Sequence, residues 1–191
     1  MNSPWNWLQS AETLKHSADL LFAAYLQSRQ LLTEDESENE DTKVAGVATL
    51  LYGLAMENIL KAALLKEGFA EVQTDGRVKW NAEGATGHDL LSMCRSSKLV
   101  SLNAEQEKLM ERMSAFVFWA GKYPTPLTFK DPKPNKDFKG LLLSGQPQAS
   151  SVMLPVEFMA EEDKDLFHEI YELFSKRVTD RLKPHIAKVG C

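Results

Sequence analysis

The sequence predicts an all-α fold, an up-and-down bundle of four to five helices. Apolar residues recur three or four positions apart in several long segments, which is the spacing of one helix face. One of these segments is apolar around nearly its whole circumference, which is typical of a buried helix. Because 191 residues of 43% hydrophobic composition suffice for one packed core, we expect a single domain over residues 1–191.

The first predicted helix covers residues 4–32. Ser3 and Pro4 are a favourable helix start, since proline fits the first helical position. Residues 33–42 carry six acidic side chains and no hydrophobic residue, so they cannot bury enough surface to offset the chain entropy lost on ordering. We therefore expect a flexible acidic linker at 33–42.

The second predicted helix, residues 43–67, is the most apolar part of the chain and should form the centre of the core. Gly68 follows it at a position suited to a left-handed helix cap. Beyond it, Asp75-Gly76 is a favoured hairpin turn and predicts a small excursion near residues 70–80.

Three further helices are predicted from apolar periodicity. A short one opens near Gly87 and reaches about Ser97, a longer one runs over 103–121 behind a capping box, and the last covers 161–183 before Pro184. The region from Pro124 to Pro155 holds six prolines and cannot be a continuous helix. We expect a long irregular loop over residues 124–160.

Bulk properties narrow the function classes. The net charge of −5 and the pI near 5.5 argue against coating nucleic acid by charge alone, although a local basic site remains compatible. Cys94 and Cys191 are the sole cysteines, so a disulfide framework is not expected and a reducing cytoplasm fits best. No uncharged span approaches the roughly 20 residues that a membrane crossing requires, so we expect a soluble protein.

Glu57, Asn58 and Lys61 form a narrow polar sector on the otherwise apolar second helix. A carboxylate and an ammonium on a buried helix can bind a phosphate or transfer a proton. The same residues also fit an ordinary ion pair, since Glu four positions before Lys is the favourable helical orientation. We take Glu57 as a candidate catalytic residue and Asn58 and Lys61 as candidate substrate-binding residues.

His88 and Asp89 open the short third helix, where an imidazole can act as acid or base near neutral pH. His88 is a candidate catalytic residue and Asp89 a candidate substrate-binding residue. The alternative roles are structural, with Asp89 matched to the helix dipole and His88 as a capping or interhelical hydrogen-bonding group. No His or Cys pair has metal-ligand spacing, so we expect neither a metal nor a cofactor.

Lys122 and Tyr123 follow the glycine that ends the fourth predicted helix. The Lys122 ammonium, beside an aromatic ring, is a candidate catalytic group for a phosphate or carboxylate, and Tyr123 a candidate substrate-binding residue. Lys122 also fits a second role, which is to neutralise the negative end of the preceding helix dipole.

Three short motifs occur in a fixed order. They are Glu57-x-x-Leu60-Lys61 in the central helix, Gly87-His88-Asp89-Leu90 at the start of a shorter one, and Tyr123-Pro124 after a long one. Together they resemble HEPN domains over roughly residues 8–185. That resemblance implies a helical bundle, frequent dimerisation and, in many members, metal-independent RNA cleavage in toxin–antitoxin, phage-defence or RNA-processing systems.

The catalytic members of that family use an arginine followed, after four to six residues, by a histidine. Here Arg181 and Arg177 precede His185 with three and seven intervening residues, so neither pair fits. Relatives often carry arginine before Tyr-Pro, whereas this chain has Lys122, which keeps the charge but lacks the two-pronged guanidinium.

The sequence therefore leaves three hypotheses. The first is a homodimeric, RNA-associated or defence-system bundle with lost or altered ribonuclease activity, working with a nucleotidyltransferase or antitoxin partner. The second is a metal-independent endoribonuclease in which Glu57, His88 and Lys122 meet in one cleft as a substitute site. The third is a helical protein-interaction module.

Overall fold

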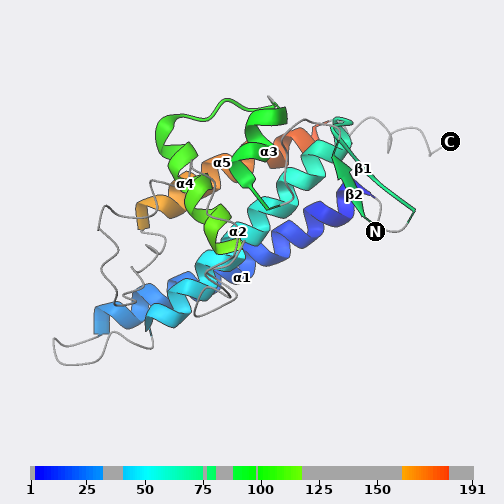
Figure 1. Cartoon of the computed structure of the whole chain (residues 1–191). Helices are drawn as coiled ribbons and strands as arrows, with labels where there is room; N and C mark the ends of the chain where they lie inside the picture. The colour runs from blue at the N-terminus through cyan, green and yellow to red at the C-terminus, as the bar shows by residue number, and fades with distance from the viewer. Residues whose placement is uncertain are drawn as a thin grey trace, which may run out of the picture.

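Five helices and one two-stranded sheet make up the part of the chain that the structure, a computed structural model, describes (Figure 1). The described residues are 3–31, 41–74, 77–80, 88–97, 99–117 and 161–180. The predicted all-α fold is confirmed. The predicted loop at 124–160, residues 118–121 of the fourth predicted helix and Pro184 lie outside the described residues.

Helices α1 (Pro4–Leu31) and α2 (Asp41–Lys66) lie side by side as an antiparallel pair (Figure 1). The Asn58 amide donates to the Ser10 hydroxyl at 3.2 Å, and the Tyr52 hydroxyl donates to the Asp19 carboxylate at 2.7 Å. Residue numbers thus rise along α1 while they fall along α2. At its start, α1 has the expected cap, because the backbone N–H of Trp5 donates to the Ser3 hydroxyl.

Helix α2 forms the centre of the core. Its fully buried apolar side chains are Ala45, Ala48, Tyr52, Ala55, Met56, Ile59, Leu60, Ala62, Ala63 and Leu64. By length and composition alone, Val44–Lys66 would suffice to cross a membrane, but 67% of its most apolar window is buried inside the bundle. This burial is typical of the core helix of a soluble protein.

The boundary between the predicted acidic linker and α2 was wrong by two residues. Asp41 and Thr42 belong to the helix, and helix boundaries are the part of a sequence pattern that is hardest to place. Residues 33–40 lie outside the described part of the chain.

Gly68 ends α2 as predicted. Its φ of 79° is left-handed, and the N–H of Phe69 donates to the Leu64 carbonyl at 2.9 Å while that of Gly68 donates to Leu65 at 3.3 Å. These two bonds satisfy carbonyls that the helix leaves without partners. The chain then turns directly into the predicted hairpin.

That hairpin consists of β1 (Ala70–Val72) and β2 (Val78–Trp80), which pair antiparallel with Ala70 opposite Trp80. The Gln73 N–H donates to the Arg77 carbonyl at 2.8 Å and extends the pairing toward the turn. Asp75 and Gly76, the predicted turn residues, lie outside the described part.

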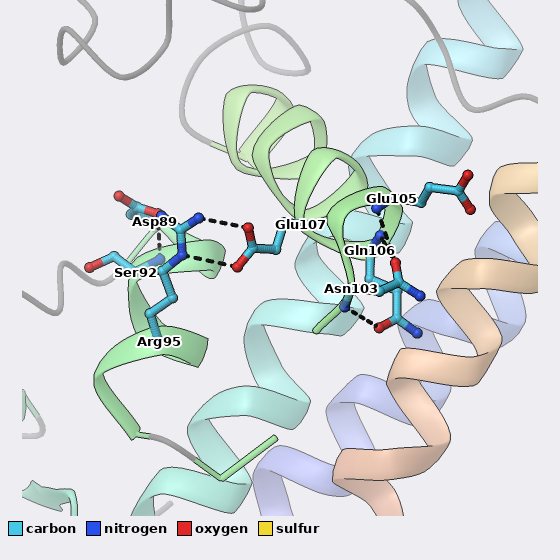
Figure 2. Close-up of polar contacts among 7 residues, drawn as sticks. All are labelled: Asp89, Ser92, Arg95, Asn103, Glu105, Gln106 and Glu107. Carbon is cyan, nitrogen blue, oxygen red and sulfur yellow. Dashed lines mark hydrogen bonds and ion pairs between the residues drawn. The ribbon is translucent and has the colours of Figure 1, made fainter. Parts of the chain in front are cut away.

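Helices α3 (Leu90–Ser97) and α4 (Ala104–Ala115) form a second, smaller pair. The Arg95 guanidinium donates to both carboxylate oxygens of Glu107, at 3.1 and 2.8 Å (Figure 2). At the start of α4, Asn103 and Gln106 form the predicted capping box, in which each side chain accepts from the other residue's backbone N–H (Figure 2).

Helix α5 (Glu161–Thr179) completes the core. Arg112, near the end of α4, is ion-paired with Asp163 at the start of α5, so these two helices run antiparallel. At its other end, the Lys66 ammonium donates to the carbonyls of Arg177 and Val178 at 2.8 and 2.7 Å. Helices α2 and α5 therefore end together, and α1, α2, α4 and α5 alternate in direction along the chain.

Helix α2 lies close to Met113 of α4 and to Val117 at Gly53. A Cβ atom at this position would lie 2.6 Å from Cγ2 of Val117 and 3.2 Å from the Met113 carbonyl oxygen. Valine has little χ1 freedom with which to move away. The two helices can therefore cross this closely only because residue 53 is a glycine, which has no Cβ atom.

We expect Gly53→Ala to destabilise the protein, even though alanine favours a helix interior over glycine by about 1 kcal/mol. Overpacking a filled contact costs about 1 to 3 kcal/mol, and the backbone carbonyl of Met113 cannot yield easily. Urea unfolding should give a net loss, and adding Val117→Ala should cost less in the Gly53→Ala protein than in the wild type. A more stable Gly53→Ala variant would contradict the contact.

Candidate functional site

Glu57, Lys61 and His88 meet in one cluster, called here the Glu57 cluster. The Lys61 ammonium makes a short ion pair with Oε1 of Glu57, one helical turn away on α2. Nδ1 of His88, just before α3, lies 3.1 Å from the other oxygen, Oε2. The carboxylate side chain is 6% exposed and the imidazole 51% exposed. Two of the three predicted catalytic residues are thus in direct contact.

Two hydrogen bonds fix the start of α3, one made by Asp89 and one by Leu90. Oδ1 of Asp89 accepts the N–H of Ser92 at 2.9 Å and so caps the helix (Figure 2). The N–H of Leu90 donates to the buried Ser114 hydroxyl at 3.0 Å, and that hydroxyl donates to the Met110 carbonyl at 2.7 Å. These bonds hold the backbone next to His88. Asp89 thus caps α3, a role that was not predicted for it, and His88 makes the interhelical hydrogen bond that was one of its predicted structural roles.

Helix α1 contacts the side chains of the cluster and of its neighbour Asn58. The Lys61 ammonium lies 5.1 Å from the centre of the Trp7 ring, and Asn58, a predicted substrate-binding residue, is hydrogen-bonded to Ser10. The buried Trp7 indole N–H has no hydrogen-bond partner among the described residues. Sequence reasoning missed Trp7 and Ser10. The one signal for them was their spacing of three residues, which puts both on the same face of α1. That face could be assigned to the Glu57 cluster only after the alignment of α1 against α2 was known.

The hydrogen bond to Glu57 decides which nitrogen of His88 carries the proton. Because a carboxylate only accepts, Nδ1 must donate, and a neutral ring then keeps its lone pair on Nε2. No described residue bonds to Nε2. A half-exposed imidazole, oriented by a buried carboxylate, is an arrangement suited to general base and acid catalysis.

The other predicted site residues, Lys122 and Tyr123, lie outside the described part of the chain. The structure thus shows a contact between Glu57 and His88, and the predicted meeting of both with Lys122 in one cleft stays a prediction. Lys61 makes the ion pair with Glu57 that its spacing also predicted, and its role in binding substrate stays a prediction. Among the described residues, no group of three or more His, Cys, Asp or Glu could hold a metal ion.

A second polar network joins three helices around Asp19 of α1. Its carboxylate accepts from Tyr52 of α2 at 2.7 Å, pairs with Lys15 at 3.2 Å, and lies 3.1 Å from Nε2 of His168 on α5. Burial alone would raise the pKa of Asp19, but the hydrogen bonds from Tyr52 and Lys15 outweigh it and lower that pKa. Burial and the Asp19 charge raise the pKa of the Tyr52 hydroxyl. No sequence pattern indicated this network, since Tyr52 counted as apolar and His168 as isolated.

An open hollow lies beside His168, away from the Glu57 cluster. Its lining residues are Gln106 of α4 and Asp165, His168, Glu169, Glu172, Leu173 and Lys176 of α5. Three carboxylates against one ammonium make the hollow unfavourable for a phosphate. The Glu57 cluster is therefore the better candidate for chemistry on an anionic substrate.

Glu57→Gln and Lys61→Met should each lower the free energy of unfolding by about 3 kcal/mol, because each leaves a buried charge without its counterion. The double variant should lose less than the sum of the two. Chemical unfolding at pH 7 measures the cycle. Arg95→Met and Glu107→Gln form the matched control, since that exposed pair should contribute about 1 kcal/mol or less. Additive losses at Glu57 and Lys61 would contradict the pairing.

Asp19→Asn should reduce stability in a pH-dependent way. A carboxyl with a lowered pKa in the folded state stabilises the protein above its unfolded pKa, about 3.9, and loses that contribution as the pH falls through the folded value. The difference between wild type and Asp19→Asn should therefore be full at pH 5 and shrink at lower pH. Thermal unfolding across this range measures it, and a difference independent of pH would rule out the charge as its source.

Comparison of the chain with protein-family models, with curated proteins and with solved structures finds no match. The resemblance to HEPN domains accordingly rests on residues of this chain, among them Glu57, Lys61 and His88.

Proposed function

We propose that this protein is a HEPN-like bundle that binds RNA and cleaves it without a metal ion, through an altered site centred on His88. The supporting observation is the hydrogen bond between Nδ1 of His88 and the buried Glu57 carboxylate. It leaves Nε2 on a half-exposed ring as the base. The arginine–histidine pair of the resembling family is absent, so this dyad takes the role of proton acceptor.

In the proposed reaction, Nε2 of His88 removes the proton from a ribose 2′-hydroxyl. The 2′-oxygen attacks the adjacent phosphorus, the bond from phosphorus to the 5′-oxygen breaks, and the leaving oxygen takes a proton from water. The His88 imidazolium then gives its proton to the hydroxide that remains, which restores the base. Glu57 stabilises the imidazolium that forms, because the carboxylate is held 3.1 Å from Nδ1. Lys61 balances the Glu57 charge before the reaction begins.

The rest of the proposal follows the resemblance. With a net charge of −5, phosphate binding must be local, and Lys122 with Tyr123 is the proposed contact to the RNA backbone. We further propose a cytoplasmic homodimer that works with a nucleotidyltransferase or antitoxin partner.

RNA binding without cleavage is the second candidate function, and one observation favours it. The Glu57 carboxylate already pairs with the Lys61 ammonium, so neither group is free to stabilise the charge of a transition state.

His88→Ala should reduce RNA cleavage by about 100-fold or more, since a positioned general base contributes about that much. The assay is incubation of the pure protein with mixed cellular RNA in excess chelator, followed by mapping of the ends. Glu57→Gln and Lys122→Ala should also reduce the rate. His16→Ala is the matched control, because His16 is an exposed histidine of α1 and should leave the rate unchanged.

Two outcomes decide between the candidates. Equal cleavage by wild type and His88→Ala would sink the proposed catalytic role. RNA binding by a wild type that does not cleave, weakened by Lys122→Ala, would instead support the binding bundle. DNA of the same sequence should remain intact, because it lacks the attacking 2′-hydroxyl.

A further inference from the structure

Trp7 contacts the Glu57 cluster from α1, outside the residues that carry the proposed chemistry. Its ring centre lies 5.1 Å from the Lys61 ammonium, which is also paired with Oε1 of Glu57. The Lys61 side chain is only 12% exposed. The ammonium is therefore held by a carboxylate and an aromatic ring with little access to water, and this setting strengthens both attractions.

The position of the Trp7 ring is set by rigid elements. Leu8 and Ala11, its neighbours on α1, are buried in the core. One turn further along, the hydrogen bond between Ser10 and Asn58 ties α1 to α2 beside Lys61. These contacts fix the backbone of α1 from which the ring extends toward Lys61.

We propose that Trp7 is a positioning residue for His88 that acts through Lys61 and Glu57. The ring holds the ammonium against Oε1, and this leaves Oε2 as the acceptor for Nδ1 of His88. The proton then stays on Nδ1 and the lone pair on Nε2. The consequence for RNA cleavage rests on the proposed function, whereas the effect on the His88 ring does not.

The competing role for Trp7 is packing alone. A packing residue changes the stability of the bundle when it is replaced, but it has no reason to change which nitrogen of His88 carries the proton. The position of that proton therefore separates the two roles.

The test is a long-range proton–nitrogen NMR spectrum of the full chain labelled with ¹⁵N-histidine, at a pH where His88 is neutral, with His88→Ala to assign its signals. The wild type should carry the proton on Nδ1. Trp7→Leu should move most of the population to the Nε2–H form, which an unrestrained imidazole favours. Trp7→Phe keeps an aromatic face and should resemble the wild type. Trp5→Leu, at a tryptophan that is 48% exposed, is the matched control and should have no effect.

A Trp7→Leu protein that folds and keeps the proton on Nδ1 would overturn the proposal. Lys61→Met supplies the second test. Without the ammonium nothing competes with His88 for Oε2 of Glu57, so the proton should stay on Nδ1, and Trp7→Leu should then leave the tautomer unchanged. A tautomer that still shifts with Trp7→Leu in the Lys61→Met background would overturn the proposal, because the ring would then not act through Lys61. If Trp7→Leu does not fold, Trp7→Met takes its place in both tests. If the tautomer responds while the wild type cleaves no RNA, the positioning role stands and the proposed ribonuclease fails.

Discussion

The burial of a carboxylate on the core helix is the constraint on which the site depends. Glu57 lies on a helix whose other buried side chains, Thr49 apart, are hydrophobic, and its side chain is 6% exposed. A lone buried charge is costly, so the surrounding structure must supply a cation and hydrogen-bond donors. Lys61 and His88 supply them from α2 and from the start of α3. The position of α3 and the orientation of His88 both bring a hydrogen-bond donor to the Glu57 carboxylate.

Most of the fold was predictable because the signals are local. Helical spacing indicated all five helices, the Asn103 capping box marked the start of α4, and Gly68 marked the end of α2. The end of the acidic linker was misplaced because charge composition says little about where a helix begins. The contact between Glu57 and His88 was anticipated only in part, because both residues stood out as polar groups in apolar surroundings.

The remaining features depend on pairings between distant segments. Asp19 meets His168 across 149 positions of sequence, and no local pattern connects them. Gly53 matters because Val117 lies opposite it, which a helix wheel cannot show. Trp7 looks like an ordinary residue of an amphipathic helix until the antiparallel register places it beside Lys61. Contacts between side chains of different helices can be recognised only after the helices have been placed relative to one another.

The contact between Lys66 and the end of α5 bears on how the protein is made. The Lys66 ammonium donates to the carbonyl of Arg177, which lies 111 positions further along the chain. Domains form during synthesis from the N-terminus onward, and contacts over long sequence separations form slowly because loop-closure entropy must be lost first. Helix α2 therefore leaves the ribosome well before the helix that covers one of its apolar faces. Until α5 is synthesised, that face lacks its α5 cover, and incompletely packed chains of this kind are prone to aggregate.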